Sequence, residues 1–196
     1  KVAVQAAGGV FAEQAERSNV RDYGQTALIA RVSATRPVAH RAYERFTEEG
    51  PLALLPQDGA DGQQYALVWC VSPQRAEVLL ALDDAEFLSE LGQAFGTRLG
   101  RFTGATARVS YPLGLNADAG ATARTVAIGN AAQTLHPVAG QGLNLGLRDA
   151  VVLARMLARD ATPDALARFA AERRRDRGLV VGLTDTMARV FANGGR

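Results

Sequence analysis

The sequence has little cysteine, little histidine and no long hydrophobic run. A single cysteine, Cys70, among 196 residues excludes a disulfide framework and any site built from several thiolates. With two histidines in the whole chain, a metal site is a poor expectation. No stretch reaches the ~18 consecutive apolar residues of a membrane-spanning helix, and the start of the chain lacks the pattern of a signal peptide. We therefore expect a cytoplasmic protein without a metal ion.

An excess of charge of one sign is also lacking. The 22 Lys plus Arg nearly balance the 20 Asp plus Glu, and a formal net charge of +2 is too small to indicate a nucleic-acid binder. Apolar residues, by contrast, are plentiful. They make up 47% of the chain, which is typical of a protein with a buried core. At ~100–200 residues per domain, the length fits one domain or slightly more.

Up to residue 128 the chain has the pattern of short strands, which are joined by short turns in its first part. Apolar and β-branched runs, or alternating patterns, predict strands at residues 26–34, 43–47, 52–55, 65–71, 108–113 and 124–128. The segment 57–62 has the composition of a turn. Strands that follow one another through short turns favour an antiparallel sheet. With the helices described next, this predicts an α+β fold.

A helix is predicted between these strands. Asp83 or Asp84 can cap a segment whose apolar residues, from Phe87 to Leu99, follow helical spacing. Gly92, Gly96 and Gly100 recur on one face of it. Because glycine costs ~1 kcal/mol relative to alanine inside a helix, either another element packs closely there or the helix frays at Gly96.

Two further helices close the chain. The first starts near Leu143 and is apolar except for one polar stripe, which is typical of a mostly buried helix. The second starts at Thr162-Pro163-Asp164, an N-cap followed by proline. We interpret its arginines at 173–175 and 177 as a solvated face, with an anion or membrane-surface site as the alternative. We interpret its apolar stripe as core: Leu179, Leu183, Met187, Val190 and Phe191.

The segment between the last strand and the first of these helices carries the chemistry. The strand ends at Gly129, and Gly140-Gln141-Gly142 leads into the helix. Glycines before a helix let a ligand approach the backbone, and the unpaired N–H groups of the first turn favour negative charge. The spacing Gly-x-Gly-x-x-x-Gly is not the dinucleotide fingerprint, so a pyrophosphate cradle is a poor interpretation. A tight turn packed against a sheet is the alternative.

The whole string from Gly129-Asn130-Ala131-Ala132-Gln133 through His136-Pro137 to Gly142-Leu143-Asn144 is more specific. It resembles the second flavin-binding motif of the class A FAD-dependent aromatic hydroxylases. Asn130 and Gln133 replace the usual Asp and His, as in the ubiquinone-biosynthesis branch, and the string is most similar to the 2-octaprenyl-6-methoxyphenol hydroxylases. Segments at 43–56, 67–70, 94–100 and 184–193 agree, so the resemblance runs from about Asp22 to Asn193.

The resemblance implies roles for these residues. Gly129 and Asn130 would lie at the flavin ribityl chain, and Pro137 beside the reactive edge of the ring. The pyrimidine side would be wrapped by Gly140, Gln141, Gly142, Leu143 and Asn144. Their backbone N–H groups would stabilise the negative charge of the reduced flavin. Pro137 and His136 are the catalytic candidates, although for His136 we favour a structural role in holding the loop over proton chemistry.

The resemblance also implies a reaction. NAD(P)H reduces the FAD, O2 adds to give a flavin hydroperoxide, and one oxygen passes to an aromatic ring. In this branch the substrate is a polyprenyl phenol, so we expect a membrane-surface entrance, a location at the inner membrane, and contacts with other ubiquinone-biosynthesis proteins. Nucleic acid and metal play no part.

Three regions follow from this interpretation. Residues 1–120 would form the substrate-binding sheet, 121–160 the second flavin motif, and 161–196 a C-terminal helical region. The N-terminal Gly-x-Gly-x-x-Gly and Asp-Gly motifs of the family are missing. We therefore expect an internal fragment that holds half of the flavin site, binds no stoichiometric FAD and is inactive alone. The alternatives are a sibling hydroxylase of another aromatic substrate and a non-catalytic assembly module.

Overall fold

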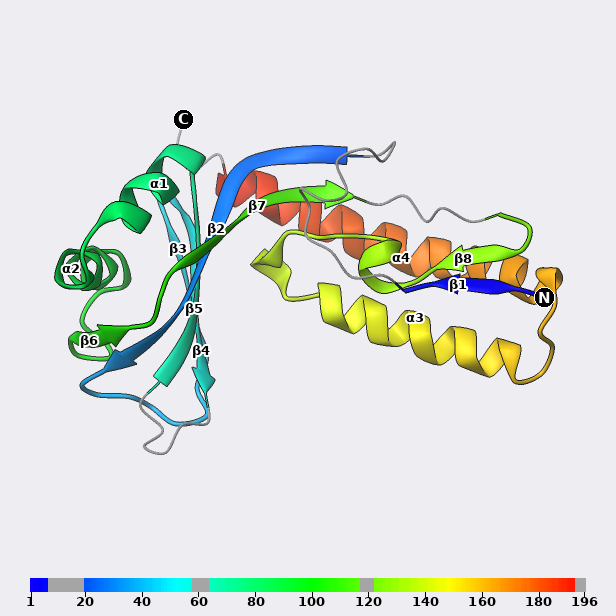
Figure 1. Cartoon of the computed structure of the whole chain (residues 1–196), viewed down its shortest axis with the longest axis horizontal. Helices are drawn as coiled ribbons and strands as arrows, with labels where there is room; N and C mark the ends of the chain where they lie inside the picture. The colour runs from blue at the N-terminus through cyan, green and yellow to red at the C-terminus, as the bar shows by residue number, and fades with distance from the viewer. Residues whose placement is uncertain (7–19, 58–63, 117–121, 193–196) are drawn as a thin grey trace. The chain divides into compact units, whose positions relative to one another are not determined.

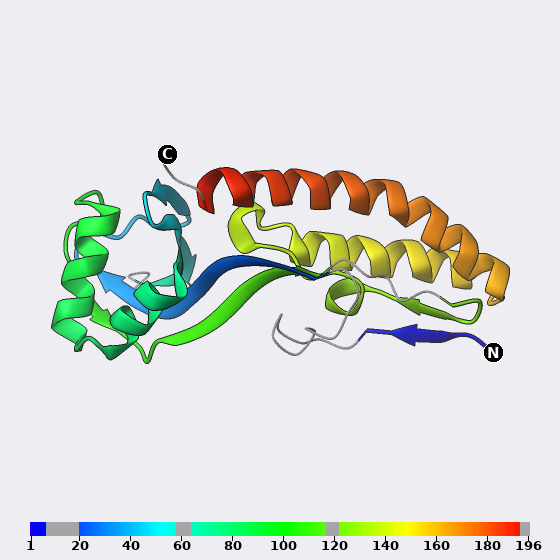
Figure 2. The same ribbon diagram turned by 90° about the horizontal axis from the view of Figure 1, so that it is seen from above.

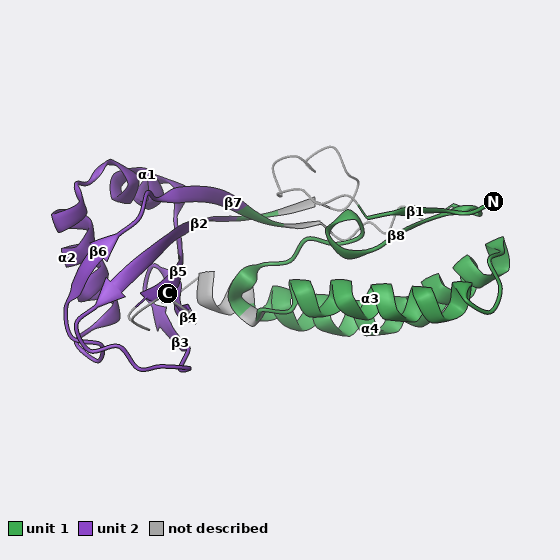
Figure 3. Cartoon of the chain, turned by 60° about the horizontal axis from the view of Figure 1, so that its bottom comes forward, with its two compact units in different colours: residues 1–23, 113–190 green, residues 24–112, 191–196 purple. Residues whose placement is uncertain are grey.

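The chain divides into two compact units (Figure 3). The computed structural model describes residues 1–6, 20–57, 64–116 and 122–192, so the turn predicted at 57–62 falls almost entirely outside the described residues. Unit 1 consists of Lys1–Tyr23 and Leu113–Val190, and unit 2 of Gly24–Pro112 and Phe191–Arg196. Each unit thus combines segments that are distant in the sequence. No helix among the described residues is long and apolar enough to cross a membrane.

An antiparallel sheet forms the basis of unit 2 (Figure 1). Its strands follow the order β3-β4-β5-β2-β6, and β7 also pairs with β2. The bounds are β2 (Val20–Ala34), β3 (Tyr43–Thr47), β4 (Gly50–Gln57), β5 (Gln64–Val71), β6 (Phe102–Ala105) and β7 (Val109–Asn116). Leu28 and Leu52 both lie opposite Trp69 in the register, which places three large apolar side chains in one row. The predicted α+β fold with an antiparallel sheet is confirmed.

Two helices, α1 (Pro73–Ala81) and α2 (Asp84–Phe95), pack on the sheet face that carries this row. Asp83 and Glu86 form a capping box at the start of α2. The helix ends at Gly96, which has a φ of 87°, a value that glycine adopts readily and other residues rarely do. A Cβ at Gly92 would meet nothing within 4 Å. The helix therefore ends at Gly96, and Gly92 has no close packing partner. Gly100, beyond the helix, does have one, because a Cβ there would lie 2.1 Å from Oγ1 of Thr35.

Helix α1 and the short strand β6 were not predicted from the sequence. A start signal for α1 was present, because Ser72 precedes a proline and its side chain accepts a hydrogen bond from the N–H of Arg75. The four residues of β6 are too few to show a period.

Unit 1 contains a short parallel pair of strands and two long helices. β1 (Ala3–Gln5) pairs with β8 (Thr125–Ala127), and α3 (Gly142–Leu157) lies alongside α4 (Pro163–Ala192) in both views (Figures 1 and 2). Two 3₁₀ turns, η2 (Gly129–Ala131) and η3 (Pro137–Ala139), connect β8 to α3. Among the described residues of this unit, one small apolar cluster has four buried members: Val126, Leu153, Leu166 and Phe169.

Two expectations about the helices of unit 1 are wrong. On α3 a row of apolar side chains is exposed rather than buried, with exposed fractions of 73% at Leu143 and 57% at Leu147. On α4, Leu179 and Leu183 are exposed by 76% and 62% instead of lying in the core, and Met187 is half-buried. The side chains of Val190 and Phe191, predicted to belong to the same stripe, lie outside those that the structure describes. The inward faces of both helices carry polar groups as well as apolar ones. The spacing of apolar residues therefore predicted the two helices correctly but predicted the wrong buried face for each.

Candidate functional site

The candidate site begins where β8 ends and the chain turns at Gly129. Gly129 adopts a φ of 59°, a left-handed conformation that favours glycine. A Cβ at Gly146, in the second turn of α3, would lie 3.4 Å from the Cα of Gly129. The two ends of the predicted flavin motif therefore meet through a glycine–glycine contact. Gly146 was part of the spacing noted in the sequence, but its contact with Gly129 was not predicted.

The turn before α3 leaves space beside its backbone. Gly140 closes η3 with a φ of 59°, Gln141 is the N-cap of α3, and the helix begins at Gly142. A Cβ at Gly140 or Gly142 would meet nothing within 4 Å. No side-chain hydrogen bond caps the helix at Gln141. The first turn of α3 thus presents the positive end of the helix dipole beside two uncrowded glycines.

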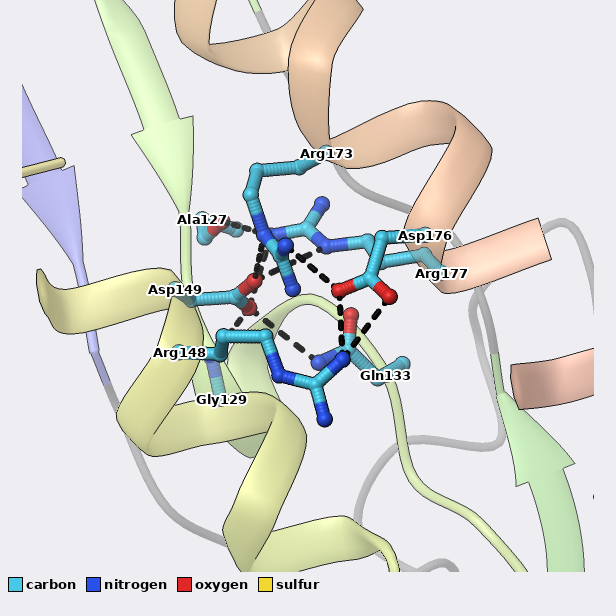
Figure 4. A network of polar contacts seen from close by, with 8 residues as sticks. All are labelled: Ala127, Gly129, Gln133, Arg148, Asp149, Arg173, Asp176 and Arg177. Atoms are coloured by element: carbon cyan, nitrogen blue, oxygen red, sulfur yellow. Dashed lines mark hydrogen bonds and ion pairs between the residues drawn. The ribbon is translucent and has the colours of Figure 1, made fainter. Parts of the chain in front are cut away.

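A buried carboxylate, that of Asp149, forms hydrogen bonds and ion pairs that hold this motif in place (Figure 4). Asp149, on α3, is fully buried and accepts hydrogen bonds from four groups. The N–H of Gly129 lies 3.3 Å from Oδ2, and Nε2 of Gln133 lies 3.2 Å from the same oxygen. From α4, Nε of Arg173 lies 2.8 Å from Oδ1, and Nη2 of Arg177 lies 2.8 Å from Oδ2. One side chain therefore joins the strand end, the loop and both helices.

The arginines extend this network on both sides. Nη2 of Arg177 also donates to the carbonyl oxygen of Ala127, the last residue of β8, over 3.2 Å. Asp176 accepts from Nη1 of Arg173 and, over 2.8 and 2.9 Å, from Nη1 of Arg148. Three arginines and two aspartates thus lie in one cluster, so its net charge is positive.

The pKa of Asp149 follows from these contacts. Burial is the largest single influence and acts to raise the pKa, but the hydrogen bonds from Arg177, Arg173 and Gln133 and the charge of Arg177 together outweigh it. The pKa of Asp149 therefore lies below its ordinary value, and the carboxylate is ionised at neutral pH. Removing it would leave two largely buried guanidinium groups without their main partner.

The interpretation of residues 173–177 as a solvated face is wrong for two of the arginines. Arg173 is buried and Arg177 is nearly so, whereas Arg174 and Arg175 are exposed. Arg173 and Arg177 are four residues apart and therefore share one face of α4. That spacing was visible in the sequence, but the buried carboxylate they contact was not identified as their partner.

His136 has a defined place in the loop. Its ring is buried, and Nδ1 accepts a hydrogen bond from the N–H of Val138 over 3.1 Å, which caps η3. Burial lowers the pKa of His136 to about 4, so the imidazole is neutral at pH 7. This geometry favours the structural role over proton chemistry, while its assignment as a catalytic residue stays a prediction.

The other predicted site residues lie along the same stretch. Asn130 is exposed in η2, and Pro137 is exposed as the first residue of η3. Leu143 and Asn144 are exposed in the first turn of α3, where Nδ2 of Asn144 lies 3.4 Å from Oε1 of Gln141. Within the part of the chain that the structure describes, no group of three metal-binding side chains occurs.

These residues fit a flavin. A Cβ at Gly140 or Gly142 would meet nothing within 4 Å, so no side chain blocks approach to the backbone there, and the first turn of α3 offers N–H groups to electronegative ring atoms. Asn130 can both donate and accept hydrogen bonds toward a polyol chain.

Comparisons with known proteins agree with this geometry. Ubiquinone hydroxylase UbiL of Rhodospirillum rubrum is 38% identical over 179 residues, which cover 87% of this chain and 41% of that protein. The 3-demethoxyubiquinol 3-hydroxylase of Escherichia coli is 34% identical over 128 residues, which cover 65% of this chain and 32% of that protein. Among solved structures, PqsL of P. aeruginosa in complex with 2-aminobenzoylacetate matches with a TM-score of 0.76 at 25% identity. That match covers 98% of this chain and 56% of PqsL.

The chain thus spans about two fifths of the length of ubiquinone hydroxylase UbiL, to which it is similar. The predicted resemblance to FAD hydroxylases of ubiquinone biosynthesis is confirmed. A family model described as an FAD binding domain matches residues 9–181, which include the whole motif from Gly129 to Asn144. The chain belongs to this FAD-binding domain family.

Proposed function

We propose that this chain supplies one side of the flavin site and the substrate sheet of an FAD-dependent monooxygenase. The enzyme uses NAD(P)H and O2 to hydroxylate the ring of a polyprenyl phenol in ubiquinone biosynthesis. The observation that carries the proposal is the open backbone at Gly140 and Gly142 at the start of α3. The similarity to ubiquinone hydroxylase UbiL supports the choice of substrate class.

Bound FAD would supply the redox chemistry, and the residues of this chain would bind and orient it. The N–H groups at the start of α3 favour negative charge on the ring, and they are fixed before the cofactor arrives. The contacts of Asp149 with Gly129 and Gln133 hold the loop in place. Pro137, held by the His136 cap, would border the ring edge and help exclude water.

The sheet of unit 2 suits an apolar substrate. The face that carries Leu28 and Trp69 is buried under α1 and α2. The opposite face carries Ile29, Val68 and Ala53, which are directly paired across β2, β5 and β4 and are only partly buried. A row of apolar side chains that the described helices of unit 2 leave uncovered can contact a hydrocarbon ring or chain.

We further propose that the protein acts in the cytoplasm at the surface of the inner membrane, where a polyprenyl substrate is found. Contacts with other ubiquinone-biosynthesis proteins belong to the same proposal. The similarity to two enzymes named for ubiquinone chemistry supports it.

The test uses a chain extended at its N-terminus to the length of these relatives. The purified protein should show a bound-flavin absorption band near ~450 nm and oxidise NAD(P)H when a polyprenyl phenol is added. The isolated 196-residue chain should bind no stoichiometric FAD, because we expect the other part of the site to lie outside it. A correctly folded extended protein that never holds FAD would contradict the enzyme and favour a non-catalytic module. Turnover of another aromatic compound alone would favour a sibling hydroxylase.

A matched pair of variants tests the role of the open glycine. Gly142→Val places a side chain in the open space before α3 and should abolish FAD binding while the fold is retained. Gly104→Val is the control, since Gly104 in β6 also has nothing within 4 Å but belongs to unit 2. Unchanged FAD occupancy in Gly142→Val would show that no ligand approaches the backbone there.

A further inference from the structure

Three side chains lie in contact beside the flavin loop, and two of them, Tyr23 and Asp185, have no role in the function proposed so far. They are Tyr23 near the start of β2, His136 just before η3, and Asp185 on α4, all within unit 1. The hydroxyl of Tyr23 donates to Oδ1 of Asp185 over 3.2 Å. The rings of Tyr23 and His136 meet edge to face, with centroids 5.2 Å apart at 90°. Segments distant in the sequence therefore converge on the histidine that precedes Pro137.

Aspartate and histidine are both buried here, although burial of either group is costly. Asp185 has an exposed fraction of 6% and His136 of 1%. A buried carboxylate requires hydrogen-bond donors, and the Tyr23 hydroxyl is one of them. An apolar residue at position 185 would avoid this cost, so packing of α4 alone does not account for an aspartate at this place.

The orientation of His136 determines where the backbone of Pro137 lies. Its Nδ1 must point at the N–H of Val138 to cap η3. A T-shaped contact with Tyr23 restrains the plane of the imidazole, because edge-to-face aromatic pairs prefer a narrow range of geometries. The plane of Tyr23 is restrained in turn by the hydrogen bond between its hydroxyl and Asp185.

We propose that Tyr23 and Asp185 are positioning residues for the flavin loop. Asp185 orients Tyr23, Tyr23 orients His136, and His136 fixes the turn that places Pro137 beside the cofactor. This inference rests on the proposed function. None of the three side chains needs to exchange a proton in it.

The first test needs no cofactor. In the 196-residue chain, nitrogen NMR of the His136 imidazole should shift in Tyr23→Phe and Asp185→Ala, while Asp185→Asn, which keeps an acceptor oxygen, should stay close to the wild type. Tyr111→Phe and Glu172→Gln are controls, since both alter exposed side chains. Unchanged His136 signals in Tyr23→Phe and Asp185→Ala would overturn the proposal.

The second test measures FAD affinity in the extended protein by fluorescence titration. Loss of one hydrogen bond should weaken binding by roughly fivefold to tenfold in Tyr23→Phe and Asp185→Ala. Asp185→Asn should retain most of the wild-type FAD affinity, because it keeps the acceptor oxygen. If only the charge of Asp185 mattered, Asp185→Asn would lose as much affinity as Asp185→Ala. Wild-type FAD affinity in Tyr23→Phe would overturn the positioning role of Tyr23 and Asp185 but not the proposed function. A folded wild-type protein that binds no FAD would overturn the proposed function and this inference together.

Discussion

Glycines lie at tight turns in both units, but their surroundings differ. In unit 2, a Cβ at Gly50 would lie 2.3 Å from the carbonyl oxygen of Cys70, and a Cβ at Gly100 would lie 2.1 Å from Oγ1 of Thr35. In unit 1, a Cβ at Gly140 or Gly142 would meet nothing within 4 Å. Unit 2 therefore needs Gly50 and Gly100 for its own packing, whereas the space beside Gly140 and Gly142 is open, as the proposed flavin site requires.

The two units also differ in what they bury. Unit 2 encloses a large apolar core with Trp69 and Phe87 fully buried. Unit 1 has a small apolar cluster and, beside it, the buried carboxylate of Asp149 with its arginines. Apolar packing is the cheaper way to stabilise a domain, and buried ion pairs add little net stability. The network is better understood as a device that fixes the loop from Gly129 to Gln133 in one position.

The largest expected effect comes from breaking that network. Asp149→Asn leaves two arginines beside a neutral side chain and should lower the free energy of unfolding by about 3–5 kcal/mol. Amide hydrogen exchange should increase in unit 1, whereas Trp69, the single tryptophan, should report an unchanged unit 2 by fluorescence. Glu77→Gln, at an exposed position, is the control. A loss below about 1 kcal/mol would show that the network contributes little to the stability of unit 1.

A smaller effect is expected from filling a glycine site in unit 2. Gly50→Ala collides with the Cys70 carbonyl at a φ of 140° and should cost about 2–4 kcal/mol, measured by denaturant unfolding with Trp69 fluorescence. Gly142→Ala should change stability by less than about 1 kcal/mol, because it meets open space inside a helix. Equal losses in both variants would remove the contrast between the units.

Acidification should weaken unit 1 through His136. The unfolded chain takes up this proton near pKa 6.5 and the folded chain only near pKa 4, so protons favour the unfolded state between these values. The free energy of unfolding should fall by up to about 3 kcal/mol as pH drops from 6.5 to 4. The low pKa of Asp149 adds a further loss only below that window.

Two histidine variants separate this effect from general acid sensitivity. His136→Asn keeps an acceptor that can cap η3 but does not titrate, so unfolding curves at pH 6.5 and 4 should move closer together. His40→Asn should keep the wild-type slope, because His40 is exposed. A steep slope that persists in His136→Asn would show that other groups carry the acid sensitivity.

The smallest effect is expected on the exposed row of α3. Leu147→Gln should change the free energy of unfolding by less than about 0.5 kcal/mol, as surface substitutions do. Leu153→Ala, on the buried face of the same helix, should cost about 2–5 kcal/mol. A large loss in Leu147→Gln would mean that this row is covered in the folded chain.

The sequence predicted the elements whose signals are local. The alternation of aromatic and charged residues predicted β3, the capping residue Asp83 predicted the start of α2, and Thr162-Pro163 predicted the start of α4. The string from Gly129 to Asn144 predicted the strand, loop and helix of the flavin motif in the correct order. Period alone could not show which faces of α3 and α4 point inward, because the buried groups there include the charged side chains of Asp149 and Arg173.

Most of the contacts that stabilise the site join residues that are distant in sequence. Asp149 and Arg177 are 28 positions apart, and Tyr23 and Asp185 are 162 apart. Residue types alone do not predict such pairs, because a run of arginines is equally typical of a solvent-exposed helix face. Only the packing of α4 against α3 and the loop made these side chains partners.

Protection of backbone amides by FAD tests the central claim most directly. Hydrogen exchange of the extended protein should be compared with and without FAD at residues Gly140 to Asn144 and at residues of unit 2 near Gly50. We expect FAD to slow exchange in the first turn of α3 severalfold or more and to leave the amides near Gly50 unchanged. Binding of FAD without protection at residues 140–144 would contradict the assignment of this turn as part of the flavin site.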